Sequence, residues 1–116
     1  MPVRMRAVGY PPAMGRMSRA QLDALVEEAT VDCHDEDEQV SGLYTIIVDN
    51  LAVPFRTTVL GVEVTVQDID LTGRNDIVAQ CSRGAFRQAI SVLDLPLPAP
   101  PPEGAQWIEA YRHWAR

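Results

Sequence analysis

The sequence contains no lysine or arginine between Ala20 and Phe55, although this stretch carries nine acidic side chains. Of the sixteen acidic residues in the chain, the other seven lie outside this stretch, together with all ten basic residues, which are arginines. The net charge of -6 is therefore concentrated in one half of the sequence. Because recognition of nucleic-acid phosphates needs a basic face, we expect no nucleic-acid partner for this half.

Cysteine is scarce, and no long hydrophobic run is present. The two cysteines, Cys33 and Cys81, are too few for a disulfide scaffold, and their apolar surroundings favour reduced thiols in a cytoplasm. No run approaches the ~20 apolar residues of a membrane helix, and the first residues lack the apolar region of a secretory signal. We therefore expect a cytoplasmic protein with no membrane partner.

The length of 116 residues and the hydrophobic content of 47% predict one domain with a real core. Residues 1–16 contain three prolines and two glycines without any sustained period, and we expect a disordered lead-in there. Ser18 is a suitable N-cap for a helix that follows at once. The predicted single domain thus comprises residues 17–116.

The acidic half has the apolar spacing of helices. Apolar residues at intervals of three and four predict a helix from Gln21 to Val40, and Gly42 is expected to interrupt it. A second short helix is predicted from Leu43 to Asn50, although its β-branched residues also fit a strand. Residues 17–54 would form an acidic helical hairpin. On the first helix, one flank would carry a ridge of four carboxylates: Glu28, Asp32, Asp35 and Glu36.

The second half has the period of strands. Alternating apolar residues predict a strand over 62–71, and two shorter strands are predicted over 77–81 and 86–92. Residues 55–94 would form a small antiparallel β-sheet or an SH3-like barrel. A proline-rich connector over 95–104 leads to a predicted C-terminal helix over 105–116, with an aromatic stripe that we expect to be structural. The predicted fold class is α+β.

Six of the nine acidic residues fall within 28–38. Crowded carboxylates repel one another. A bound calcium ion, which takes six to eight oxygen ligands, commonly offsets this repulsion. A solvated acidic helix face is the commoner explanation of charge runs in general.

The stretch lacks the central glycine of an EF-hand loop. Cys33 and His34 are adjacent and would point apart on a helix, which argues against zinc. No serine stands in a nucleophile context, and we expect no enzymatic activity.

The stretch Val31-Asp-Cys-His-Asp-Glu-Asp-Glu-Gln39, followed by Gly42, Asp49-Asn-Leu51 and Pro54-Phe55, resembles a small cyanobacterial calcium-binding protein family that is not of the EF-hand type. The resemblance implies a calcium ion as ligand and a strand-rich half followed by a helix with two tryptophans. His34, Cys33, Leu43 and Val48 depart from the family pattern. The metal ligands that the resemblance and the cluster imply are Asp32, Asp35, Glu36, Glu38 and Asp49.

Two functions follow as hypotheses. The first is reversible calcium binding, as a buffer or sensor, at a carboxylate cluster on the first helix completed by Asp49. Waters would fill several ligand positions, with an affinity in the micromolar-to-millimolar range of open sites. The alternative is an acidic protein–protein interaction module, or a nucleic-acid-mimicking inhibitor, that needs no metal. Calcium binding distinguishes the two hypotheses.

Overall fold

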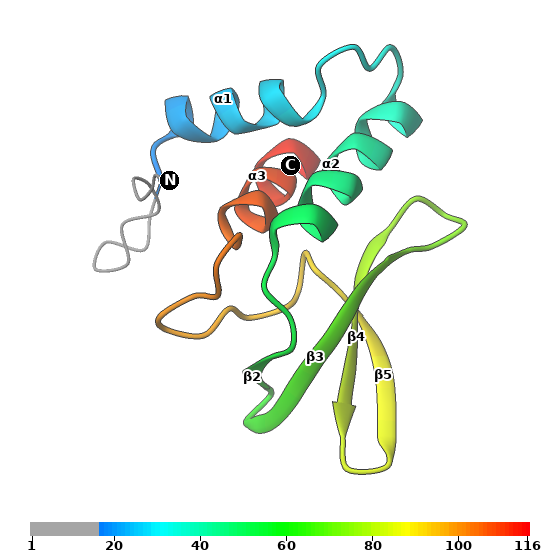
Figure 1. The fold of residues 1–116 in the computed structure, drawn as a ribbon, viewed down its shortest axis with the longest axis vertical. Coiled ribbons are helices and arrows are strands. Elements are labelled where there is room, and N and C mark those ends of the chain that lie inside the picture. The colour runs from blue at the N-terminus through cyan, green and yellow to red at the C-terminus, as the bar shows by residue number, and fades with distance from the viewer. Residues whose placement is uncertain (1–16) are drawn as a thin grey trace.

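A computed structural model describes residues 17–116, and the predicted lead-in over 1–16 lies outside the described residues. The fold is α+β, with two helices first, then a four-stranded antiparallel sheet, and a helix at the end (Figure 1). The helices are α1 (Arg19–Ala29), α2 (Glu36–Asn50) and α3 (Gln106–Ala115). The strands are β2 (Phe55–Val59), β3 (Val62–Leu71), β4 (Ile77–Arg83) and β5 (Phe86–Ser91).

The break between the first two helices lies in residues 30–35, so the single helix predicted from Gln21 to Val40 is wrong. Ser18 caps α1 as predicted, by a capping box with Gln21. Thr30 ends this helix, with its amide and hydroxyl both donating to the Val26 carbonyl. Asp35 then caps α2.

Gly42, predicted as an interruption, lies inside α2 where this helix crosses α1. A Cβ atom at this position would lie 2.5 Å from the Ala29 carbonyl oxygen, so glycine permits the close approach of the two backbones.

The sheet has the strand order β2-β3-β4-β5, and all three pairings are antiparallel. The strand predicted over 62–71 is confirmed, and the two shorter strands are confirmed within two residues at their ends. Strand β2 was not predicted. In the described residues β2 and β5 remain unpaired with each other, so the sheet stays open, and the SH3-like barrel alternative is wrong.

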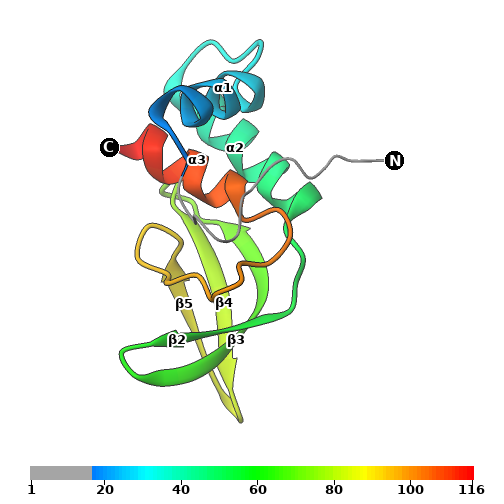
Figure 2. The ribbon, with the colours of Figure 1, turned by 90° about the vertical axis from the view of Figure 1, so that its left-hand side faces the viewer.

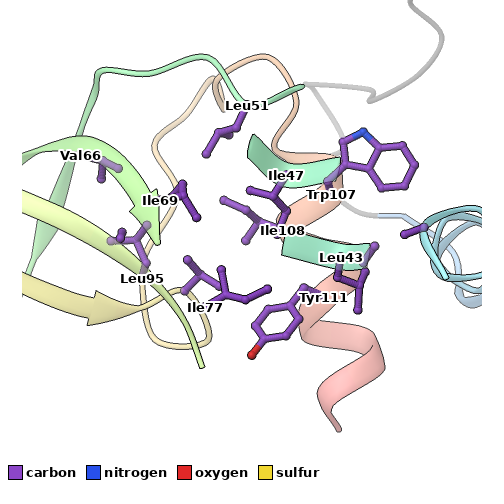
Figure 3. Packing of buried hydrophobic residues seen from close by; sticks show 14 of the residues in the cluster. Leu43, Ile47, Leu51, Val66, Ile69, Ile77, Leu95, Trp107, Ile108 and Tyr111 are labelled. Carbon is purple, nitrogen blue, oxygen red and sulfur yellow. The ribbon is translucent and has the colours of Figure 1, made fainter. Parts of the chain in front are cut away.

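The core lies where α2 and α3 pack against part of the sheet (Figures 2 and 3). Leu43 and Ile47 of α2, Ile108 of α3 and Ile77 of β4 are fully buried. Helix α1 packs on α3 and α2. Burying each such side chain stabilises the fold by about 1.5–3 kcal/mol.

The C-terminal helix is confirmed as structural, because Trp107 and Tyr111 are buried. No helix among residues 17–116 combines the length and the apolar character needed to cross a membrane.

Candidate metal-binding site

Two of the predicted ligands form the N-terminal cap of α2. Asp35 is the N-cap residue, and its Oδ1 accepts a hydrogen bond from the Glu38 amide at 2.8 Å. Glu38 Oε1 accepts one from the His34 amide at 2.6 Å. Each carboxylate is bonded through one of its oxygens, and both side chains are exposed. The local sequence Asp-x-x-Glu therefore brings these two carboxylates to the same helix terminus.

The neighbouring acids have different roles. Asp37 Oδ1 accepts a hydrogen bond of 2.6 Å from Asn75 Nδ2, which ties the first turn of α2 to the turn between β3 and β4. Asp32 lies in the connection between the helices with a φ of 65°, in the left-handed region that aspartate tolerates better than most residues. Asp32 and Glu36 are exposed, and neither side chain has a hydrogen bond among residues 17–116.

The helix terminus itself offsets part of the carboxylate repulsion. Glu36, Asp37 and Glu38 occupy the first turn of α2. The exposed amides of a helix N-terminus carry about half a positive charge, which stabilises anions there by roughly 0.3–1 kcal/mol each. The acidic run thus has a structural explanation that does not require a metal. Within 17–116, no three His, Cys, Asp or Glu side chains are positioned to hold a metal ion.

The predicted carboxylate ridge is not formed, because its members lie on different elements. Glu28 is on α1, Asp32 is in the connection, and Asp35 and Glu36 begin α2. The cluster predicted on the first helix instead lies at the start of the second. The reason is that the connection turns the chain, so helical spacing across residues 30–35 no longer relates side-chain directions.

Asp49 is also separated from the cluster. It lies in the last turn of α2, fourteen residues after Asp35, and at ~1.5 Å per residue the two are about 21 Å apart along the axis. They cannot share one ion. Asp49 instead lines an open hollow of about 400 Å³ between α1 and α2, together with Glu28, Ser41 and Thr45. The prediction that Asp49 completes the first site is therefore wrong in its geometry.

The oxygen donors around residues 32–38 fit calcium in kind. Carboxylates and backbone carbonyls are the ligands that calcium prefers, and its coordination sphere is flexible and accepts water. Asp32, Asp35, Glu36 and Glu38 are all exposed, so their side chains can rotate toward an ion. The second oxygens of Asp35 and Glu38 can coordinate without loss of the cap hydrogen bonds.

The site is connected to the C-terminal helix by contacts that the sequence did not reveal. Trp114 Nε1 donates to Gln39 Oε1 at 2.9 Å, one residue after Glu38. Tyr111 and Trp114 stack with ring centroids 6.0 Å apart. Gln39 and Trp114 are 75 residues apart in sequence, and no local pattern pairs them.

The two thiols are structural. Burial raises the pKa of the Cys81 thiol above its usual value, which disfavours the reactive thiolate. The Cys33 thiol donates to the Glu38 carbonyl at 3.3 Å and so stabilises the turn that leads into α2.

Comparison with known proteins finds similarity at the level of structure. No protein-family model matches the sequence, and no curated protein matches it significantly. The crystal structure of Anabaena CcbP superposes with a TM-score of 0.64 at 15% identity, over 86% of this chain and 93% of that one. A calcium-binding protein in its calcium-binding form superposes with a TM-score of 0.67 at 16% identity, over 85% and 95%. At these identities the likeness establishes a shared fold.

Proposed function

We propose that this protein binds calcium reversibly at the start of α2, through Asp32, Asp35, Glu36 and Glu38. The observation that carries the proposal is the placement of four exposed carboxylates on one short connection and one helical turn. The fold that carries these carboxylates is shared with a calcium-binding protein in its calcium-binding form, which supports calcium binding in general.

Asp32 and Glu36 are central to this proposal because they have no structural partner among the described residues. Asp35 and Glu38 are held by the cap hydrogen bonds and are pre-positioned. A calcium ion bound among the four carboxylates would offset the repulsion between their negative charges. Because the helix N-terminus repels a cation and water completes the coordination, the affinity should be modest, in the micromolar-to-millimolar range.

A sensor role is favoured over a passive buffer by the contacts of the first turn of α2. Asp37 bonds Asn75 of the turn between β3 and β4, and Gln39 bonds Trp114 of α3. An ion that shifts this turn would therefore perturb two other elements. Trp114 provides a fluorescence signal for such a change. We propose no enzymatic activity; burial raises the pKa of the Cys81 thiol and disfavours a reactive thiolate there.

A metal-free acidic interaction module is the second candidate. The observation in its favour is that the α2 N-terminus already offsets part of the carboxylate charge. Such a module would bind a basic partner with strong dependence on salt and no dependence on calcium.

The proposal is tested by calorimetric titration and thermal unfolding with calcium and with magnesium. Calcium should bind and raise the melting temperature. Magnesium should do so much less, because it demands octahedral geometry and keeps its waters. The double variant Asp32→Asn with Glu36→Gln removes the two carboxylates without structural bonds. It should lose most calcium binding while its metal-free stability changes by less than about 1 kcal/mol, because the helix dipole and the carboxylate repulsion act on Glu36 in opposite directions.

The matched control is Glu27→Gln with Glu103→Gln, which removes the same charge from exposed positions outside the cluster. Its calcium affinity should stay close to that of the parent. Absence of calcium binding in the parent would refute the proposal and leave the interaction module. Equal losses in both double variants would show nonspecific charge attraction only.

A further inference from the structure

The end of the sheet remote from the helices exposes large apolar side chains. Leu60, in the turn between β2 and β3, is 98% exposed, and Phe86, next to the turn between β4 and β5, is 81% exposed. Val62 on the first hairpin is 40% exposed. Both hairpin turns lie at the same end of the long axis, away from α1, α2 and α3 (Figures 1 and 2). Single exposed apolar residues are ordinary, but here three gather at one end.

The backbone at Leu60 makes its identity unexpected. Leu60 and Gly61 form a two-residue turn between the paired residues Val59 and Val62, with φ values of 51° and 78°. Such turns favour asparagine, aspartate or glycine at both central positions. A leucine there is strained, and at 98% exposure it gains nothing from packing. A residue that is unfavourable both locally and in its burial indicates a role outside the fold.

The charges around these tips are mainly positive. Arg83 and Arg87 flank Phe86 in the second hairpin, and both are exposed. Across residues 56–63 and 82–88 the charged residues are Arg56, Arg83 and Arg87 against one acid, Glu63. The helical end has the opposite character, since residues 20–55 contain no base. The molecule extends 40 Å along its longest axis, several times the ~8 Å screening length at physiological salt.

We propose that the two hairpin tips dock this protein on an anionic lipid surface, with Leu60 and Phe86 in the interfacial region and Arg83 and Arg87 near the headgroups. Protruding apolar tips need a deformable acceptor, and a bilayer interface can accommodate two of them at once. Basic side chains contribute to attraction by anionic lipids, and apolar ones contribute by burial. The predicted absence of a membrane partner rested on the lack of a spanning segment, which does not bear on surface docking.

A second copy of the chain fits this end less well. The tips and the acidic helical end are complementary in charge, but their contact would be head to tail. Such heterologous contacts generate open filaments unless their rotation closes a ring. An acidic protein partner would need pockets for two separate tips.

The experiment is co-sedimentation of the full chain with phosphatidylcholine vesicles, with and without phosphatidylserine, in the presence of a calcium chelator. The chelator removes any contribution from the proposed metal site, so the two proposals are tested independently. We expect binding that requires phosphatidylserine and weakens as salt increases. Leu60→Asn should weaken it by roughly tenfold, the order expected from loss of one buried leucine. Arg83→Gln with Arg87→Gln should reduce both the binding and its dependence on salt.

Leu60→Asn is a sharp test because Asn-Gly suits this turn, so the variant should be at least as stable as the parent. Leu93→Asn is the matched control, because Leu93 is 44% exposed and follows β5 at the end of this strand opposite to Phe86. Its vesicle binding should match that of the parent. Absence of phosphatidylserine-dependent binding, or equal binding by Leu60→Asn and the parent, would overturn the proposal. Concentration-dependent association of the protein without vesicles, abolished by Leu60→Asn, would overturn it in favour of self-docking.

Discussion

Replacing Gly42 by alanine sets a local preference of the chain against its tertiary packing. Gly42 lies inside α2, where alanine is favoured over glycine by about 1 kcal/mol. Helix propensity alone thus predicts a more stable protein. The added Cβ, however, would lie 2.5 Å from the Ala29 carbonyl oxygen and 3.3 Å from Cys33 Sγ. The first of these distances is far below ordinary contact.

The size of the net effect depends on what can move. The Ala29 oxygen belongs to the backbone of α1. The last turn of this helix is held by two hydrogen bonds from Thr30 to the Val26 carbonyl. This oxygen therefore cannot yield like a flexible side chain, and α1 itself must shift. Inserting a methyl group into such a contact typically costs 1–3 kcal/mol. Against the propensity gain, we expect Gly42→Ala to lower the free energy of unfolding by about 1 kcal/mol.

Urea unfolding followed by circular dichroism measures this difference in a calcium-free buffer. Ser41→Ala is the matched control, because Ser41 is the exposed neighbour in the same helix and has no clash to relieve. It should gain a few tenths of a kcal/mol from propensity. If Gly42→Ala proved as stabilising as Ser41→Ala, the close crossing of α1 and α2 would be refuted.

Four other predictions follow from single positions. Asp35→Ala should cost about 1 kcal/mol of stability by removing the α2 cap, whereas Asp35→Asn should cost almost nothing in calcium-free urea unfolding. Gly104→Ala should be far more destabilising than Gly61→Ala in the same assay. Both have positive φ values, of 88° and 78°, but only at Gly104 would a Cβ collide with the Asn50 carbonyl group. Trp107→Ala should lower the free energy of unfolding by about 3–5 kcal/mol with or without calcium, because this side chain is only 6% exposed. A folded variant of parental stability would contradict its burial. Burial raises the pKa of Tyr111 above its usual value of 10.0, so the unfolded chain loses this proton first, and stability should fall as pH rises above 10.0; unchanged stability there would contradict the shift.

The sheet was more predictable than the helices because its signals are local. Alternating valines over 62–66 and the glycines of the turns determine the strands and their connections, and the structure agrees. Strand β2 was missed because Phe55–Val59 is short and lacks clear alternation of apolar and polar residues. The boundary between α1 and α2 was missed because apolar residues keep a helical spacing across it. Gly42 appeared to be a breaker, yet it is there for a tertiary contact with Ala29 that no local pattern reveals.

The acidic run was ambiguous because a helix N-terminus and a calcium site select the same residues. Asp35 and Glu38 satisfy the capping pattern, and Asp37 is bonded to Asn75, so three of the carboxylates have structural tasks. The sequence alone does not show which carboxylates have these structural roles, because the roles depend on where α2 begins and on a contact with a distant turn. The remaining carboxylates are the informative ones. Asp32 and Glu36 add repulsion without a compensating hydrogen bond in the described chain, so among the four exposed carboxylates these two would gain most from a bound cation.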